Sequence, residues 1–153
     1  MAHPEQVYEK DFNVKKLTAA QKAKYKKHNL DEFPVAATVV LSIVTFGLFH
    51  WIYFGIAHEN LPKIQEDDFG AAKAILFMLI PFFNLYWVFI YWLRLYDRVN
   101  LQLKMRGINF ELPRGLVLAS IILGFIPLVS MINFILKPII VGFMQHGMNL
   151  ASK

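Results

Sequence analysis

The chain has 153 residues, of which 56% are hydrophobic and 18% are charged, and its formal net charge is +5. Its mean hydropathy is +0.41. A chain this apolar and of single-domain length is typical of small integral membrane proteins, in which the bilayer replaces a large internal core. The chain contains no cysteine, which excludes disulfides, thiolate metal sites and cysteine catalysis.

The first 33 residues form a polar, basic segment. Thr18 is placed to cap a short helix that runs from Ala19 to Lys27. The lysines ahead of the first apolar stretch are Lys15, Lys16, Lys22, Lys24, Lys26 and Lys27. Because such residues favour the cytoplasmic side of a membrane, we expect a cytoplasmic N-terminus. The same lysines either attract anionic lipid headgroups or only face solvent.

Three apolar stretches follow, and each is long enough to be a candidate membrane span. A helix needs about 20 apolar residues to cross a bilayer, which predicts spans at about 35–57, 71–96 and 115–136. Each stretch meets a helix-breaking segment, Thr45-Phe46-Gly47, Pro81 or Pro127, and each repeat ends on Asn-Leu, at 60–61, 100–101 and 149–150. Residues 34–153 are therefore expected to form an all-α integral membrane domain of three kinked transmembrane repeats.

Two alternatives concern the path of the chain at the breaks. In the third repeat, breaks at Pro127 and Pro138 favour a kinked span followed by an interfacial helix at about 139–149 on the outer surface, rather than a hairpin that turns near Pro127. In the first two repeats, turns in place of kinks would make re-entrant wedges that enter one leaflet only. Backbone groups freed at such turns would face lipid without partners, so kinked spans are favoured.

A polar stripe marks the second repeat, with residues spaced three or four apart on one helical face. Its members are Asn84, Trp87, Tyr91, Arg94 and Arg98. Such a stripe buries its polar groups within protein or in a polar groove, since an Asn that faced lipid at this depth would be costly, and its members are candidates for contact with a lipid or a partner. Alternatively, Asn84 bonds to backbone groups freed at Pro81.

Two further sets of residues are candidates for contacts within or beyond the membrane. Asn133 and Lys137 form a shorter polar strip in the third repeat, where Lys137 is read as an anchor that snorkels to the headgroups. Trp51 and Tyr53 belong to an aromatic belt at headgroup depth. Thr38, Ser42, Thr45 and Gly47 present small side chains for close helix packing.

No catalytic or cofactor motif is present, so we expect a protein that is not an enzyme and that has no cofactor. His50 and His58 lie about 12 Å apart along a helix, too far to share one metal ion. Haem bound through His50 is a minor alternative, and Glu66-Asp67-Asp68 is expected to face water. The basic charge is explained by lysines that set orientation, so no nucleic acid partner is expected.

The segment from Ser42 to Tyr53 resembles the S-I-x-T-x-G-[IL]-[YF]-x-x-[YW] signature of a family of small bacterial integral membrane proteins of unknown function. Residues 80–87 look like the I-P-x-x-N-x-Y-W variant of the same family, and the similarity covers mainly residues 35–101. Family members often carry Lys or Arg after the first aromatic cluster, where this chain has Phe54-Gly55. The resemblance implies a multi-pass protein of the bacterial inner membrane with no established chemistry.

Two functions are compatible with these patterns. The first is an accessory or scaffold subunit that packs in a membrane complex or with copies of itself. The second is a protein that binds or translocates a lipid or small solute along a polar groove that includes Asn84. Membrane lipids, other membrane subunits or a second copy of the chain are the expected partners.

Overall fold

The structure is a computed structural model that describes residues 18–64, 68–126 and 130–153. These residues form helices and no strand, so the all-α prediction is confirmed. The α-helices are α1 (Ala19–Lys26), α2 (Val35–Val44), α3 (Leu48–Asn60), α4 (Ala71–Leu76), α5 (Phe83–Met105), α6 (Arg114–Gly124) and α7 (Asn133–Ser152). Two short 3-10 segments, η3 (Phe77–Leu79) and η4 (Ser130–Ile132), precede α5 and α7.

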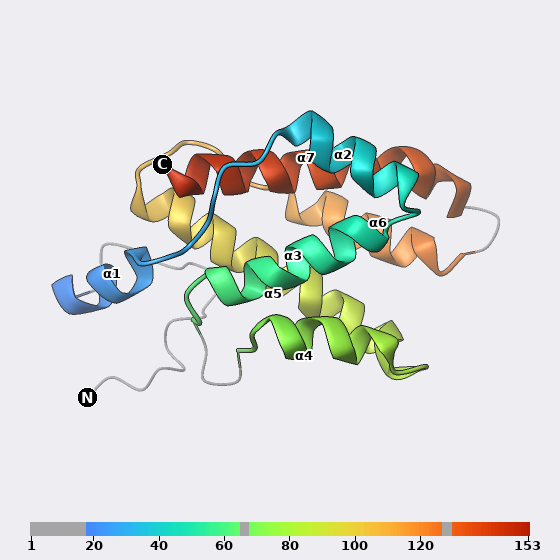
Figure 1. The fold of residues 1–153 in the computed structure, drawn as a ribbon, viewed down its shortest axis with the longest axis horizontal. Coiled ribbons are helices and arrows are strands. Elements are labelled where there is room, and N and C mark those ends of the chain that lie inside the picture. The colour runs from blue at the N-terminus through green and yellow to red at the C-terminus, as the bar shows by residue number, and fades with distance from the viewer. Residues whose placement is uncertain (1–17, 65–67, 127–129) are drawn as a thin grey trace.

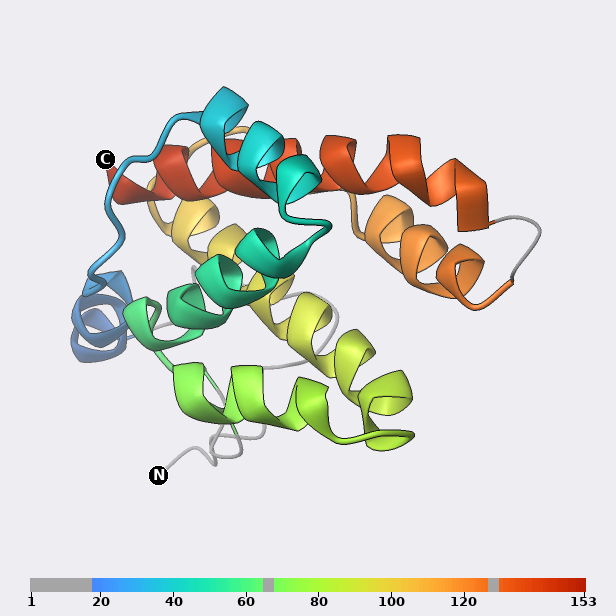
Figure 2. The same ribbon diagram turned by 45° about the vertical axis from the view of Figure 1, so that its right-hand side comes forward.

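Each of the three repeats folds back on itself as a helical hairpin. In the first repeat α2 packs on α3, and in the third α6 packs on α7. In the second repeat α4 continues into η3, which packs on α5 after the turn. The first two turns, and the ends of α6 and η4 that flank residues 127–129, lie at the same end of the molecule, on the right in Figure 1, whereas α1 and the C-terminus lie at the opposite end. The view in Figure 2 shows the same separation of the two ends.

Local backbone geometry explains why the first two breaks are turns. Phe46 and Gly47 have φ angles of 52° and 93°, and Phe82, directly after Pro81, has a φ of 62°. These positive values end a right-handed helix, and glycine adopts them without steric cost. Pro81 adds a second obstacle because it has no N–H to continue a helix.

The hairpins overturn the prediction of three kinked transmembrane spans. Across the described residues, no helix combines the length and the hydropathy that crossing a bilayer requires. The expectation of a multi-pass protein of the inner membrane is therefore wrong for the same reason. The physical cause is that the Thr45-Phe46-Gly47 and Pro81 breaks reverse the chain, so the first two apolar stretches are each divided between antiparallel arms, while the long helices α5 and α7 contain too many polar residues.

The third repeat also differs from the favoured prediction. α6 and α7 lie against each other, which is the hairpin alternative, although Pro127 itself lies outside the described residues. A separate interfacial helix at 139–149 is absent from this part of the chain, since α7 continues through Pro138. A proline removes one backbone hydrogen bond, and the packing of α7 against α2, α5 and α6 holds the helix on both sides of it.

The prediction that Thr18 caps the N-terminal helix is confirmed. The Thr18 hydroxyl accepts a hydrogen bond from the Gln21 backbone N–H, and the Gln21 side chain accepts one from the Thr18 N–H, which is a capping box. α1 and the segment after it are joined to α5 because the Gln102 side chain donates to the Tyr25 carbonyl and Arg106 contacts His28. Residues 1–17, with Lys15 and Lys16, lie outside the described residues.

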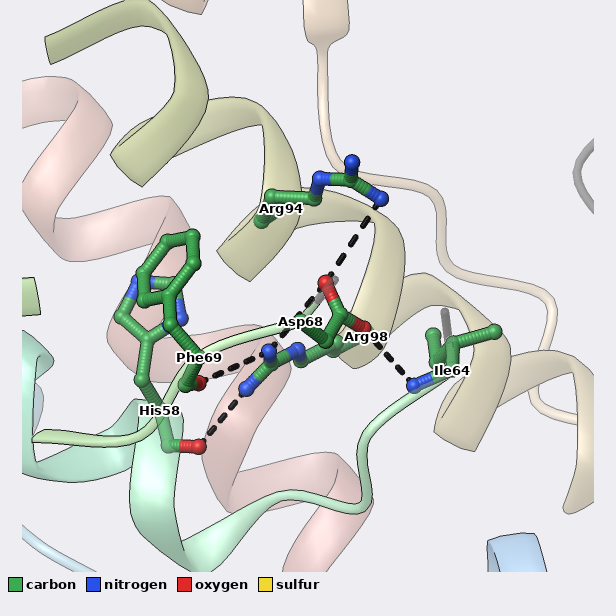
Figure 3. Close-up of polar contacts among 6 residues, drawn as sticks. All are labelled: His58, Ile64, Asp68, Phe69, Arg94 and Arg98. Carbon is green, nitrogen blue, oxygen red and sulfur yellow. Dashed lines mark hydrogen bonds and ion pairs between the residues drawn. The ribbon is translucent and has the colours of Figure 1, made fainter. Parts of the chain in front are cut away.

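A buried group of charged side chains joins α5 to the segment between α3 and α4. We call Asp68, Arg94 and Arg98 the Asp68 cluster (Figure 3). Arg98 is fully buried and lies 3.3 Å from the Asp68 carboxylate, and Arg94 lies 3.5 Å from the same oxygen. The other Asp68 oxygen accepts a 2.7 Å hydrogen bond from the Ile64 N–H. A charge without solvent must be paired and hydrogen-bonded, and here it is.

Arg98 also donates two hydrogen bonds to backbone carbonyls. One goes to His58 at the end of α3 at 2.6 Å, and the other goes to Phe69 ahead of α4 at 3.0 Å. The His58 ring packs between Phe69 and Tyr91, with ring centroids 4.7 and 4.9 Å away. Burial, and then the Arg98 charge, lower the pKa of His58 to about 3, so the imidazole is neutral at pH 7. The Arg98 guanidinium thus joins α5 to the end of α3 and to the segment ahead of α4.

Replacement of Asp68 by Asn should destabilise the fold strongly. The amide cannot neutralise Arg98, and loss of one partner of a buried ion pair costs about 3–5 kcal/mol. The measurement is the free energy of unfolding in urea, followed by circular dichroism. Glu32→Gln is the control, because Glu32 and Lys153 form an exposed pair at 3.9 Å, and its loss should cost at most about 1 kcal/mol. Equal effects of the two substitutions would contradict the role of the cluster.

Acid should reduce stability through His58. Its pKa is about 3 in the folded chain and about 6.5 when unfolded, so the unfolded state binds a proton more readily. The stabilising contribution is complete above pH 6.5 and is lost as the pH falls towards 3, by up to about 1.4 kcal/mol per pH unit. His58→Phe, which keeps a ring between Phe69 and Tyr91, should flatten the dependence of unfolding free energy on pH over this window. Unfolding curves with the same slope for both proteins would exclude this effect.

Candidate functional site

The predicted polar stripe forms one face of α5, and most of it packs inside the chain. The Trp87 indole donates to the Ala74 carbonyl at 3.2 Å, and the Tyr91 hydroxyl donates to the Trp51 carbonyl at 2.6 Å. Arg94 and Arg98 belong to the Asp68 cluster. These four side chains therefore hold α5 against α3 and α4, whereas Asn84 at the top of the stripe remains exposed.

The predicted packing residues of the first repeat use their hydroxyls locally. Thr38 and Ser42 are buried and donate to the carbonyls of Pro34 and Thr38, one turn earlier. Thr45 donates to the Leu41 carbonyl and accepts from the Phe49 N–H, so it bonds to backbone on both sides of the first turn. Gly47 lies under the His50 ring, since a Cβ at Gly47 would stand 2.9 Å from a ring carbon.

The aromatic belt residues also pack within the chain. Tyr53 stacks on Phe49, with ring centroids 5.3 Å apart, and tilts against Phe33 at 5.5 Å. Burial raises the pKa of Tyr53. Trp51 is half-buried beside the main core. Asn133 is buried and exchanges two hydrogen bonds with Ser120, so it fastens α7 to α6.

Several residues that hold the fold together were not singled out in the sequence. Asn100 accepts a hydrogen bond from the Leu112 N–H at 3.1 Å, and Asn149 bonds both the N–H and the carbonyl of Phe33. Both belong to the repeated Asn-Leu pairs, so the repeat itself was the signal. Asp68 was expected to face water and is buried instead, while Glu66 and Asp67 lie outside the described residues.

Exposed apolar side chains gather around the three hairpin turns. Phe46 is 95% exposed at the first turn, Phe82 is 87% exposed at the second, and Met131 and Phe134 are 77% and 80% exposed at the third. We call the end formed by these turns the apolar end. Its other large exposed side chains are Val44, Leu48, Leu79, Ile80, Leu85, Tyr86, Phe125, Ile126, Ile132 and Ile135. An apolar surface of this kind marks an interaction site.

Most charged residues lie at a distance from the apolar end. On either side of the first turn, the nearest charged residues in the sequence are Glu32 and Glu59, and on either side of the second they are Lys73 and Arg94. In α6, the charged residue nearest to its C-terminal end is Arg114. Lys137, about one turn into α7, is the charged residue nearest to a turn among those described. The apolar end is therefore a layer almost free of charge, bordered mainly by basic side chains.

A cavity of about 280 Å³ opens between the second and third hairpins. Four polar residues line it, His50, Asn84, Ser120 and Lys137, and its walls are otherwise apolar. Burial, and then the Lys137 charge, lower the pKa of His50 to about 4, so this ring is neutral at pH 7. Of the predicted contact residues, the structure thus brings Asn84 and Lys137 to one cavity and places Tyr91, Arg94 and Arg98 elsewhere.

Metal chemistry receives no support from the part of the chain that the structure describes. There, no three His, Cys, Asp or Glu side chains come close enough together to hold a metal ion. His50 packs against Trp92 and His58 against Phe69, with ring centroids 5.9 and 4.7 Å apart, so both imidazoles belong to aromatic packing. The apolar end and the adjoining cavity are the features that remain available for binding.

Comparisons of the chain with protein families, with curated proteins and with solved structures found no match. The resemblance of residues 42–53 and 80–87 to a bacterial family therefore stays a prediction.

Proposed function

We propose that this protein binds lipid surfaces by inserting its apolar end into the acyl-chain region of one leaflet. The observation that carries this proposal is the exposure of Phe46, Phe82 and Phe134 at three separate turns that share one end of the molecule. Burial of an exposed phenylalanine in hydrocarbon is favourable by roughly 2 kcal/mol, so three such side chains supply substantial affinity.

The length of the hairpin arms fits one leaflet. α2 has 10 residues and α6 has 11, which correspond to about 15–17 Å at ~1.5 Å per residue. The hydrocarbon core of a bilayer is about 30 Å thick, so these arms reach about half of it. Lys73 and Arg114, at the far ends of their arms, would then lie near the headgroups, where basic side chains bind anionic lipid.

Backbone hydrogen bonding at the turns removes the main objection to a re-entrant wedge. At the first turn, the Gly47 N–H donates to the Ser42 carbonyl at 2.7 Å and the Leu48 N–H to the Thr45 carbonyl at 3.1 Å. At the second, the N–H groups of Phe83 and Asn84 donate to the carbonyls of Pro81 and Ile80. Because these N–H groups are paired within the first two turns, such turns would enter hydrocarbon at a lower cost than turns with unpaired groups.

The chemistry expected of such a protein is binding and surface organisation rather than catalysis. An accessory or scaffold role, in which a second copy or another protein covers the apolar end, uses the same exposed side chains. The lipid proposal differs in one measurable respect: the protein should bind vesicles of pure lipid, without any other protein.

The triple substitution Phe46→Asp, Phe82→Asp and Phe134→Asp should abolish vesicle binding while it preserves the fold. Phe46 and Phe82 have positive φ angles, which Asp tolerates better than Phe, and Phe134 lies in the first turn of α7, where an acid is favourable. A carboxylate in hydrocarbon costs about 2.5 kcal/mol or more, so each substitution should weaken partitioning at least about 50-fold. The measurement is flotation of the protein with phosphatidylcholine vesicles on a density gradient.

The control is Ile56→Asp, which changes an exposed apolar residue of α3 far from the turn. Its position corresponds to headgroup depth, so binding should fall much less. Wild-type protein that fails to float, and that forms oligomers which the triple substitution dissolves, would contradict lipid insertion. That result would show that a second copy covers the apolar end.

A further inference from the structure

The cavity between the second and third hairpins has a mixed lining that the proposed function does not use. Its volume is about 280 Å³, near the lower bound of small-molecule sites. Apolar side chains from several helices form the walls, among them Val88, Trp92, Val117, Ile121 and Ile140. An apolar chamber with a few polar groups is the usual form of a site for an apolar molecule that carries one polar head.

The polar groups in this cavity have hydrogen-bonding capacity to spare. The Nδ1 atom of His50 is buried and has no hydrogen-bond partner among the described residues. The side chain of Asn84 makes no hydrogen bond, and Lys137 no ion pair, within the same part of the chain. A buried polar atom without a partner is unfavourable, so a ligand that supplies a partner to the His50 ring would be favoured.

The charges define the class of ligand. Lys137 is the single cation of the lining, and the neutral imidazole of His50 and the amide of Asn84 add donors without charge. This set matches one carboxylate better than a phosphate, because a phosphate brings up to two charges and three strong acceptor oxygens. The apolar walls accept a hydrocarbon chain.

We infer that this cavity binds a fatty acid, with its carboxylate at Lys137, His50 and Asn84 and its hydrocarbon chain against the walls from α5, α6 and α7. The inference goes beyond insertion into lipid and does not depend on it, since Phe46, Phe82 and Phe134 do not line the cavity. Trp92 in the wall gives an internal reporter of occupancy.

The test is a titration of the protein, in micelles of an uncharged maltoside detergent, with dodecanoate and separately with dodecanol, followed by tryptophan fluorescence and calorimetry. Lys137→Met should weaken dodecanoate binding at least tenfold and leave dodecanol binding unchanged. Lys137 is exposed, so its replacement preserves the fold. The matched control is Lys73→Met, which removes an equal charge from an exposed residue that does not line the cavity.

A second substitution, Asn84→Leu, should also weaken dodecanoate binding but strengthen that of dodecanol, because it exchanges a polar wall for an apolar one. Equal affinity for the two ligands, or the same loss in Lys73→Met as in Lys137→Met, would overturn the inference and indicate partition into the micelle. The Phe46, Phe82 and Phe134 triple variant should retain dodecanoate binding, so failure of vesicle flotation and failure of the cavity site are distinguishable.

Discussion

Burial of the Arg98 guanidinium is the constraint on which the arrangement of the hairpins depends. A fully buried cation needs a counter-charge and acceptors for its N–H groups, and here they come from three places in the chain. Asp68 supplies the charge, and the carbonyls of His58 and Phe69 accept hydrogen bonds. Because these partners lie at the end of α3 and at the start of the second hairpin, α5 fixes both hairpins at their polar ends. Their turns lie toward the other end (Figure 1).

This arrangement separates polar from apolar groups along the molecule. Three polar side chains near the same polar end bond to backbone groups of other segments. Gln102 donates to the Tyr25 carbonyl at the end of α1, and Asn100 and Asn149 accept from the N–H groups of Leu112 and Phe33, which lie between helices. At the opposite end, N–H groups of the first two turns donate to carbonyls of the same turns, and aromatic side chains remain outside. Packing between helices would bury such side chains, but among the described residues no further element covers them at the ends of the short arms, of 10 or 11 residues in α2 and α6.

The sequence predicted local features better than the path of the chain. The Thr18 cap and the stripe from Trp87 to Arg98 follow from spacing alone, and both are present. Thr45-Phe46-Gly47 and Pro81 permit either a kink or a turn, and the choice depends on the positive φ angles of Phe46 and Phe82, which are unusual for phenylalanine. Asp68 looked like a loop acid because Arg98, its partner, lies a whole hairpin away in sequence. Contacts between segments that are distant in sequence determine whether such a residue is buried, and spacing along the chain does not show them.

Lys137 is the exception to the separation of polar and apolar ends, and it links the two proposals. The residue lies about 6 Å along α7 from its first residue, close to the apolar end. A lysine at such depth is costly unless its amine reaches the headgroups or meets an anion. Its side chain lines the cavity, where its charge lowers the pKa of His50. The apolar end itself gains nothing from a cation at this position, whereas a bound carboxylate would neutralise Lys137 and supply an acceptor to His50 and Asn84. The proposed ligand in the cavity would thus account for the placement of this one charge, which contact with lipid alone would not.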